Sequence, residues 1–442
     1  MTEHFLKQFK NDVPQGPAWE TALRQGAIKR FEQLGFPTVQ WEEWKYTPVT
    51  SLTQIPFLAA KEYRPNGFKK ENLGALSLGA SQGVRLVFVN GHFARELSSQ
   101  AALPKGMIAG SLAEILKENP GAVEGKLSRQ ASFQDHPFVA LNTAFFRDGA
   151  FLYLPKDTFL KDPVELLFLS HPSEAPTVSH PRNLVIAEAG SQVSIVESYA
   201  GGGSQPYFTN AVTEIVAESG AQVDHYKIQQ EEESAFHFAT LAVKQERESR
   251  FHSHSLSLGR ALARNDLTSV LVAEGGECRL NGLYLAKGKQ RVDDHTNIDH
   301  AHPRCTSSEL YKGVLDGEAQ AVFNGRIVVR PHAEKTSARQ YNKNLLLSNE
   351  AAVNTKPLLE IFNNDVKCNH GATIGRLDEN QVFYLRSRGI GDELARHLLI
   401  YAFAADVVSA MKVPALKTHL QKLLFSRFVQ GQLPLEGLGG FA

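Results

Sequence analysis

A cysteine and a histidine two positions apart are the residues of this chain best placed to do chemistry. Cys368 and His370 stand in the segment KCNHGAT, which follows an apolar, strand-like stretch. In an extended strand, residues two apart point to the same face, so the thiol and the imidazole are predicted to lie side by side. Such a pair suits a soft metal ion, whereas an isolated Cys-x-His is more often a small buried residue beside a hydrogen-bonded histidine.

A second group of polar residues lies in the segment VDDHTNIDHAHPRC. In a straight strand His295 and Asp299 share one face, while Asp294 and His300 share the other. Side chains on opposite faces of a strand do not bind one ion. We therefore predict that this segment forms a ladder of polar side chains or part of a subunit boundary. A stand-alone His/Asp metalloenzyme stays as an alternative. The carboxylates and imidazoles of this segment are Asp293, Asp294, His295, Asp299, His300 and His302.

Two further histidines, His252 and His254 in the segment FHSHS, also share a predicted face. Neither a third ligand nor a carboxylate adjoins them in the sequence. We therefore expect ordinary surface residues and assign them no role.

The composition excludes several classes of function. Lys plus Arg and Asp plus Glu number 47 each, so the formal net charge is zero, and no basic segment predicts binding to nucleic acid or to an anionic membrane. The three cysteines, Cys278, Cys305 and Cys368, are too few for a disulfide scaffold or for a four-cysteine cluster site in one copy of the chain. Any metal cluster handled here would need ligands from a partner, from histidine or from small thiols.

Three regions are expected to position these residues. Residues 1–149 are predicted to form a helical and α/β region, residues 150–390 a β-rich core, and residues 391–442 a helical region. The core repeats a pattern of strand, acidic-glycine corner and strand, as in IVAESGAQVDHYKI and LDGEAQAVFNG, and RLDENQVFYL varies that pattern. Such imperfect repeats favour a β-solenoid, although a jelly roll or sandwich also contains many short strands.

The helical region is predicted to contain two helices, the second beginning at Pro414. Their apolar positions recur at helical spacing, which suits either packing on the end of the solenoid or docking of a partner. The positions that we expect to form the docking surface are Leu394, Leu398, Tyr401, Val408, Leu416 and Leu420. Near the start of the chain, Trp41, Trp44 and Tyr46 are expected to anchor a loop to the body of the fold.

Four long segments resemble the SufD family of the SUF iron–sulfur cluster assembly machinery. The first covers Val353–Ile390, where SufB, the paralogous partner, typically has Glu-His-Glu-Ala-Thr in place of Cys-Asn-His-Gly-Ala-Thr. The others are LGFPTVQWEEWKYTPV, FVALNTAFFRDGAFLYLP and VFNGRIVVRPHAEKTSARQYNKNLLLS. Matches of this length, spread over most of the chain, are far more specific than a short motif.

The resemblance implies a right-handed parallel β-helix and a non-catalytic scaffold subunit. Such a subunit would pair with SufB through its last coils, dock the ABC-type ATPase SufC on its C-terminal helices, and share a transient iron–sulfur cluster with SufB. His370 and Cys368 would be its candidate ligands. No cofactor is expected to be tightly bound by the isolated chain, and a homodimer of the isolated chain stays an open alternative.

Other sequence features agree with a subunit that is not itself an enzyme. No phosphate-binding GxxxxGK[ST] motif is present, so ATP hydrolysis is expected in SufC. A β-helix carbohydrate-active enzyme stays as an alternative, but it predicts a secretory segment. The first residues, MTEHFLKQFKNDV, are neither apolar nor acid-poor, so a cytoplasmic location is expected.

Overall fold

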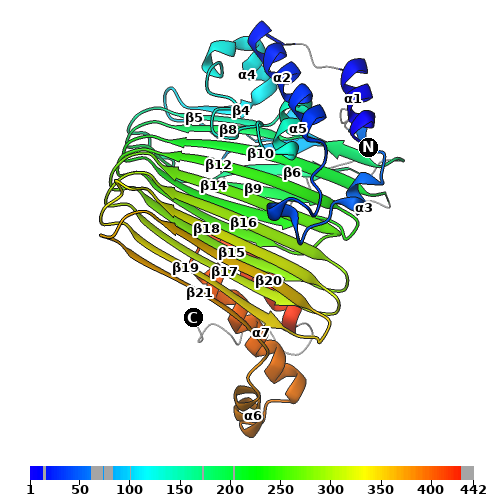
Figure 1. Cartoon of the computed structure of the whole chain (residues 1–442), viewed down its shortest axis with the longest axis vertical. Helices are drawn as coiled ribbons and strands as arrows, with labels where there is room; N and C mark the ends of the chain where they lie inside the picture. The colour runs from blue at the N-terminus through cyan, green and yellow to red at the C-terminus, as the bar shows by residue number, and fades with distance from the viewer. Residues whose placement is uncertain are drawn as a thin grey trace.

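The computed structural model describes residues 1–12, 16–60, 73, 83–99, 101–171, 174–202 and 205–429. Over these residues the chain forms a parallel β-solenoid with helices towards both ends of the sequence (Figure 1). Successive long strands enter two sheets in turn, so each coil contributes one strand to each sheet. The predicted mainly-β class with a parallel β-solenoid core is therefore confirmed.

We call the two walls of the solenoid sheet A and sheet B. Sheet A follows the order β20-β18-β16-β14-β12-β10-β8-β5-β4, and β1 and β7 pair at its side. The strands of sheet A are β1 (Leu58–Ala59), β4 (Ile108–Ser111), β5 (Ala150–Leu154), β7 (Thr177–Ser179), β8 (Arg182–Ala187), β10 (Tyr207–Ala217), β12 (Phe236–Gln245), β14 (Leu262–Leu271), β16 (Arg291–His300), β18 (Gln320–Val329) and β20 (Ala352–Ile361).

Sheet B follows the order β21-β19-β17-β15-β13-β11-β9-β6-β2-β3. Because β2 and β4 both precede residue 150, the region expected to be a separate N-terminal unit also supplies strands to both walls. The strands of sheet B are β2 (Arg85–Val89), β3 (His92–Phe93), β6 (Val164–Ser170), β9 (Gln192–Gly201), β11 (Gln222–Gln230), β13 (Arg250–Ser257), β15 (Glu277–Ala286), β17 (Thr306–Leu315), β19 (Ser337–Leu346) and β21 (Lys367–Gly375).

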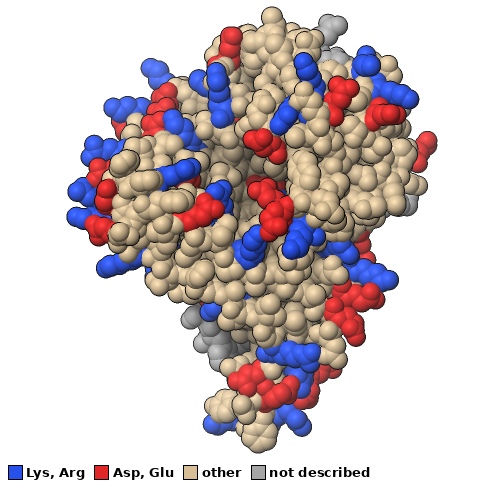
Figure 2. Space-filling view, in the orientation of Figure 1, with Lys and Arg blue, Asp and Glu red and all other residues tan. Residues whose placement is uncertain are grey.

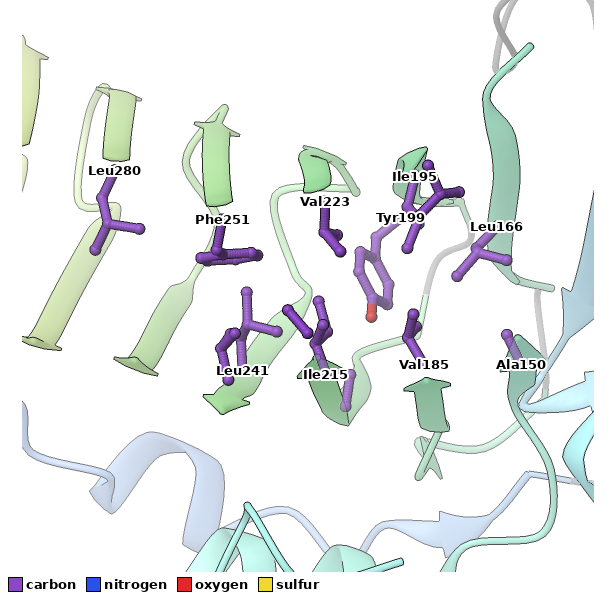
Figure 3. Packing of buried hydrophobic residues seen from close by; sticks show 14 of the residues in the cluster. Ala150, Leu166, Val185, Ile195, Tyr199, Ile215, Val223, Leu241, Phe251 and Leu280 are labelled. Carbon is purple, nitrogen blue, oxygen red and sulfur yellow. The ribbon is translucent and has the colours of Figure 1, made fainter. Parts of the chain in front are cut away.

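The space between the two sheets is the main core. Along each strand alternate residues point inward, and in the N-terminal coils most of these are apolar. Figure 3 shows Ile195, Val223 and Phe251 of sheet B pointing towards Ile215 and Leu241 of sheet A. Burial of these side chains on both walls stabilises the stack by roughly 1.5–3 kcal/mol for each large apolar residue.

Glycines at the corners let successive coils approach closely. Gly288 and Gly317 occupy equivalent corners with φ of +59° and +64°, a backbone region that glycine adopts without strain. A Cβ atom on Gly317 would lie 3.0 Å from the backbone nitrogen of Gly288. At the acidic-glycine corner Asp316-Gly317, a glycine is therefore required by how closely the two coils approach.

The N-terminal helices lie against the outer face of sheet A (Figure 1). Trp44 attaches the connecting loop, because its ring stacks on Phe238 and lies 3.7 Å from the guanidinium carbon of Arg264. The predicted anchoring is confirmed for Trp44, whereas Tyr46 is exposed. The helices and short 3-10 turns of this region are α1 (Thr2–Asn11), α2 (Ala18–Leu34), η1 (Glu42–Trp44), α3 (Thr50–Thr53), η3 (Arg95–Leu97), α4 (Leu112–Glu118), η4 (Pro120–Ala122) and α5 (Pro137–Phe145).

The two C-terminal helices, α7 (Asp392–Ser409) and α8 (Pro414–Val429), pack on the outer face of sheet B. The second helix begins at Pro414, as predicted. The expectation that these helices cover the end of the solenoid was wrong, because their apolar residues contact outward-facing residues of β11, β13, β15 and β17. Residues 430–442 of the predicted helical region lie outside the described residues.

One segment predicted as part of the β-core is a helix instead. Helix α6 spans Glu379–Ser387, and the carboxylate of Asp378 caps it by accepting from the backbone N–H of Asn380 at 2.9 Å. The interpretation of RLDENQVFYL as strand, corner and strand was therefore wrong. Figure 1 shows α6 projecting beyond β21 at the far end of the solenoid from the N-terminal helices.

Charged side chains of both signs are interspersed over the face shown in Figure 2, without a broad patch of one sign. This distribution agrees with the balanced composition of the chain. Among the described helices, none has both the length and the apolar character needed to cross a bilayer.

Candidate functional site

The last coil of the solenoid carries the Cys-x-His pair. Within the described residues, β21 pairs with β19 along one edge only, so its other edge is open. Cys368 lies opposite Ala338 and His370 opposite Gln340, and both of these β19 residues point inward and are fully buried. The thiol and the imidazole are therefore on the inward face of the final strand, on one side as the alternation predicted.

The two side chains have different surroundings. Cys368 is half-buried and packs into a small apolar cluster with Ala338 and Val366, and this burial raises the pKa of its thiol. His370 is exposed. The imidazole is thus accessible from the open end, while the thiol serves partly as a packing residue, so His370 is the stronger candidate ligand.

The other two cysteines cannot join this pair. Cys278 and Cys305 are both fully buried, and burial raises the pKa of Cys278 to about 12. Cys368 is therefore the one cysteine of the chain with an exposed fraction.

A polar column extends from His370 into the solenoid. On sheet B the inward residue behind His370 is Gln340, and the one behind Gln340 is Glu309. The Gln340 amide donates from Nε2 to Glu309 Oε2 at 2.5 Å. Burial raises the pKa of Glu309 to about 7, so this carboxyl holds a proton far more readily than an exposed glutamate.

Apolar side chains surround the open end. The strand edges of β20 and β21 offer unpaired backbone groups, which in proteins are usually covered or paired. Exposed large apolar residues gather on these strands, on the loop after β20 and on α6, where single-residue exposure reaches 70%. They are Ile361, Phe362, Ile374, Phe383 and Tyr384.

The polar segment 293–302 does not form one site. Asp293 points outward and binds Arg264 Nη1 at 2.7 Å and Thr47 Oγ1 at 2.5 Å, so it holds the N-terminal segment on the solenoid. His295 lies 2.9 Å from Asp293, and Asp299 pairs with Arg330.

The inward members of the same segment face the core. Burial raises the pKa of Asp294 to about 6, and Asn265 donates to this carboxyl at 2.8 Å. His300 is buried against Ser307, and burial lowers its pKa to about 4. His302 is exposed beyond the strand. The segment therefore splits between two faces, as the parity argument predicted.

The predicted docking positions on the C-terminal helices divide into two groups. Val408, Leu416 and Leu420 are fully buried against sheet B, so the prediction that they face a partner was wrong. They hold the helical pair on the solenoid instead. Leu394, Leu398 and Tyr401 are half-buried on α7 and keep part of their surface exposed.

A polar contact that the sequence did not reveal joins the helical pair to sheet B. His252 is buried between Asp224, at 3.4 Å, and Glu277, at 3.0 Å. Lys412, between α7 and α8, donates to Asp224 at 2.8 Å. The expectation that His252 and His254 lie on the surface was wrong, because both are buried. Lys412, 160 positions after His252, covers His252, and no local pattern contains that information.

Comparison with known proteins places this sequence in a family. Residues 168–403 match the family described as SUF system FeS cluster assembly, SufBD core domain, and residues 14–166 match the SufBD protein N-terminal region. An iron-sulfur cluster assembly SufBD family protein of Synechocystis is 36% identical over 414 residues, which cover 92% of this chain and 90% of that protein.

Two further relatives have similar coverage. The iron-sulfur cluster assembly protein SufD of Escherichia coli is 31% identical over 92% of this chain and 93% of its own length. The chloroplastic protein ABCI7 of Arabidopsis thaliana is 30% identical over 87% of this chain and 81% of its own length. The chain belongs to the SufBD family of iron–sulfur cluster assembly proteins.

Proposed function

We propose that this chain is a SufD-like, non-catalytic scaffold subunit that forms half of a cluster assembly site. The observation that supports this most directly is the open last coil, where His370 is exposed on the inward face of an edge strand. A second chain that covered this end would enclose the imidazole and add the ligands that a single copy lacks. By resemblance, that chain is a SufB-like subunit.

The site suits a cluster that is cargo and not a resident cofactor. His370 offers an imidazole nitrogen, and Cys368 offers a partly accessible thiol, which together are too few ligands for a stable iron–sulfur cluster. A cluster held here would depend on the partner, and it would leave when the boundary between the two chains opened. The iron–sulfur cluster is therefore the substrate of the assembly.

The exposed part of α7 is proposed to dock the ATPase partner, SufC. Leu394, Leu398 and Tyr401 present apolar surface there, while Lys312 connects the helix to the solenoid through Asp406 at 2.6 Å. A movement of α7 that followed nucleotide binding by the ATPase would thus be transmitted to sheet B. Nucleotide can shift the boundary only if it binds one arrangement more tightly than the other.

The test replaces the candidate ligand in the reconstituted complex with SufB and SufC. We expect His370→Ala to lower the yield of assembled cluster by about tenfold or more, since losing even the hydrogen-bond partner of a metal ligand costs roughly 10–100-fold in affinity. Cluster formation is followed by its visible absorbance, and size-exclusion chromatography verifies that the complex stays intact.

His302→Ala is the matched control, because His302 is also an exposed histidine of the solenoid but lies away from the last coil. We expect this variant to assemble clusters normally. Undiminished assembly by an intact complex that contains His370→Ala would show that the imidazole is not a ligand.

A further inference from the structure

Gln340 is a buried amide with one end engaged and the other end free. Its side chain is fully buried, and Nε2 donates to Glu309 Oε2 at 2.5 Å. Within the described part of the chain, no group donates to Gln340 Oε1. Leaving a buried carbonyl oxygen without a donor costs about 1–3 kcal/mol, which makes this position a place to look for a function.

The opposite wall of the solenoid fixes where this amide lies. Gly325 of β18 faces Gln340, and a Cβ atom on Gly325 would lie 2.3 Å from Gln340 Nε2. The absence of a side chain at Gly325 therefore makes room for the amide. With Glu309 on the preceding coil and Gly325 across the core, the amide is held from two directions.

The next inward residue along the same column is His370. Gln340 and His370 are directly paired in the parallel register of β19 and β21, and neighbouring strands are about 4.8 Å apart. Paired side chains that point to the same face of a sheet stack on one another at this spacing. Because His370 is the residue paired with Gln340 on the next strand, its imidazole is the ring placed to donate to Gln340 Oε1.

We propose that Gln340 positions His370: a turn of the exposed imidazole brings one ring N–H to Gln340 Oε1, which then accepts the hydrogen bond that it lacks. A neutral imidazole has one N–H and one lone pair, so this bond fixes which nitrogen keeps the lone pair and turns it towards the open end. Ligand histidines in proteins nearly always have such a partner. The inference rests on the proposed function for its purpose, but the hydrogen bond itself does not require a cluster.

The test measures the tautomer of His370 in the full-length chain, without metal. Nitrogen-15 spectra of histidine-labelled protein at about pH 9, where an ordinary imidazole is neutral, report the two tautomers, and His370→Gln assigns the resonance. We expect one tautomer to dominate in the native chain. Gln340→Met, which removes the acceptor at similar volume, is expected to change the tautomer ratio by roughly three- to tenfold.

Two other variants separate positioning from a general loosening of the core. Gly325→Ala is expected to alter the His370 resonance in the same direction, because it displaces the amide and leaves both residues in place. Asn342→Leu on the same strand removes a buried hydrogen bond to Tyr284 but lies in a different column, so the resonance should not change. If Gln340→Met fails to fold, Gly325→Ala carries the test.

The outcomes distinguish this inference from the proposed function. An unchanged tautomer ratio in folded Gln340→Met or Gly325→Ala would overturn the positioning role, even if His370→Ala abolished cluster assembly. A changed ratio, together with normal assembly by His370→Ala, would leave the hydrogen bond standing and refute the ligand assignment. In the complex, we expect Gln340→Met to lower the affinity for added Fe²⁺ by roughly 10–100-fold.

Discussion

Glu309 is a carboxylic acid enclosed between two coils, and its burial has a consequence for pH. The pKa of this group rises from an ordinary 4.5 to about 7, so between these values the folded chain binds a proton that the unfolded chain has released. The unfolding free energy therefore falls as the pH rises from about 4.5 to 7, and it levels off above that range.

Glu309→Gln removes this dependence and keeps a group that can bond to Gln340. We expect the variant to be more stable than the native chain at pH 8, by on the order of 2–3 kcal/mol, and equal to it near pH 4. Urea unfolding at a series of pH values measures this difference. Glu318→Gln, at an exposed corner, should leave the pH profile unchanged, and a parallel shift at all pH values would contradict the explanation.

At the level of single residues, the sequence predicted which side chains of a strand share a face. Alternation placed Cys368 with His370, and separated His295 from His300, without any knowledge of the coils. The alternation of side chains does not reveal which face of a strand is buried by other parts of the chain. His252 looks like a surface residue because the lysine that covers it, Lys412, belongs to the connection between α7 and α8, which is distant in the sequence. Burial of this kind is a property of the tertiary fold.

At the level of elements, some apolar residues of the C-terminal helices pack on sheet B and others keep part of their surface exposed. Leu420 of α8 is buried against sheet B, so Leu420→Ala is expected to lower the free energy of unfolding by about 2–5 kcal/mol. Leu398→Ala on α7, where the side chain is only half-buried, should cost less than about 1 kcal/mol.

If α7 docks SufC, as we propose, the affinity for SufC should respond in the opposite order. We expect Leu398→Ala to weaken the affinity of the chain for SufC, while folded Leu420→Ala binds almost normally. Isothermal titration calorimetry of both variants measures this, alongside chemical unfolding. Equal losses of affinity would show that the exposed side of α7 is not the contact.

The error at α6 has a physical explanation. The residues Val382, Phe383 and Tyr384 favour strands, and within the described residues the outer edge of β20 is open for a further strand. Asp378 and Glu379 instead start a helix, where negative charge suits the N-terminal end, and only Val382 becomes buried. The helix-start signals at Asp378 and Glu379 therefore outweighed the strand propensity of the residues that follow, although both residues are visible in the sequence.

At the level of the whole molecule, the solenoid is closed along its sides and open at its last coil. We expect the isolated chain to associate with a second copy through this end, and Phe362→Asp to weaken both that association and the pairing with SufB. Sedimentation at several concentrations measures the first effect, and co-purification measures the second. A charge placed in a buried apolar contact is strongly unfavourable.

The chain provides a matched control for this experiment. Phe159 and Phe362 are both 60% exposed, but Phe159 lies near the start of the solenoid, beside Gln192. Phe159→Asp should therefore leave association unchanged. Equal effects of the two substitutions would mean that the open coil is not the contact surface.

Because β21 pairs in register with β19, the length of the loop before β21 decides which residues of β21 point inward at the open end. If one residue were lost between Phe362 and Val366, Asn369 would take the place of Cys368 and Gly371 that of His370. The thiol and the imidazole would then face solvent on the outer wall. During evolution, the deletion or insertion of one codon in this loop can therefore remove Cys368 and His370 from the open end or return them to it, without any substitution in β21.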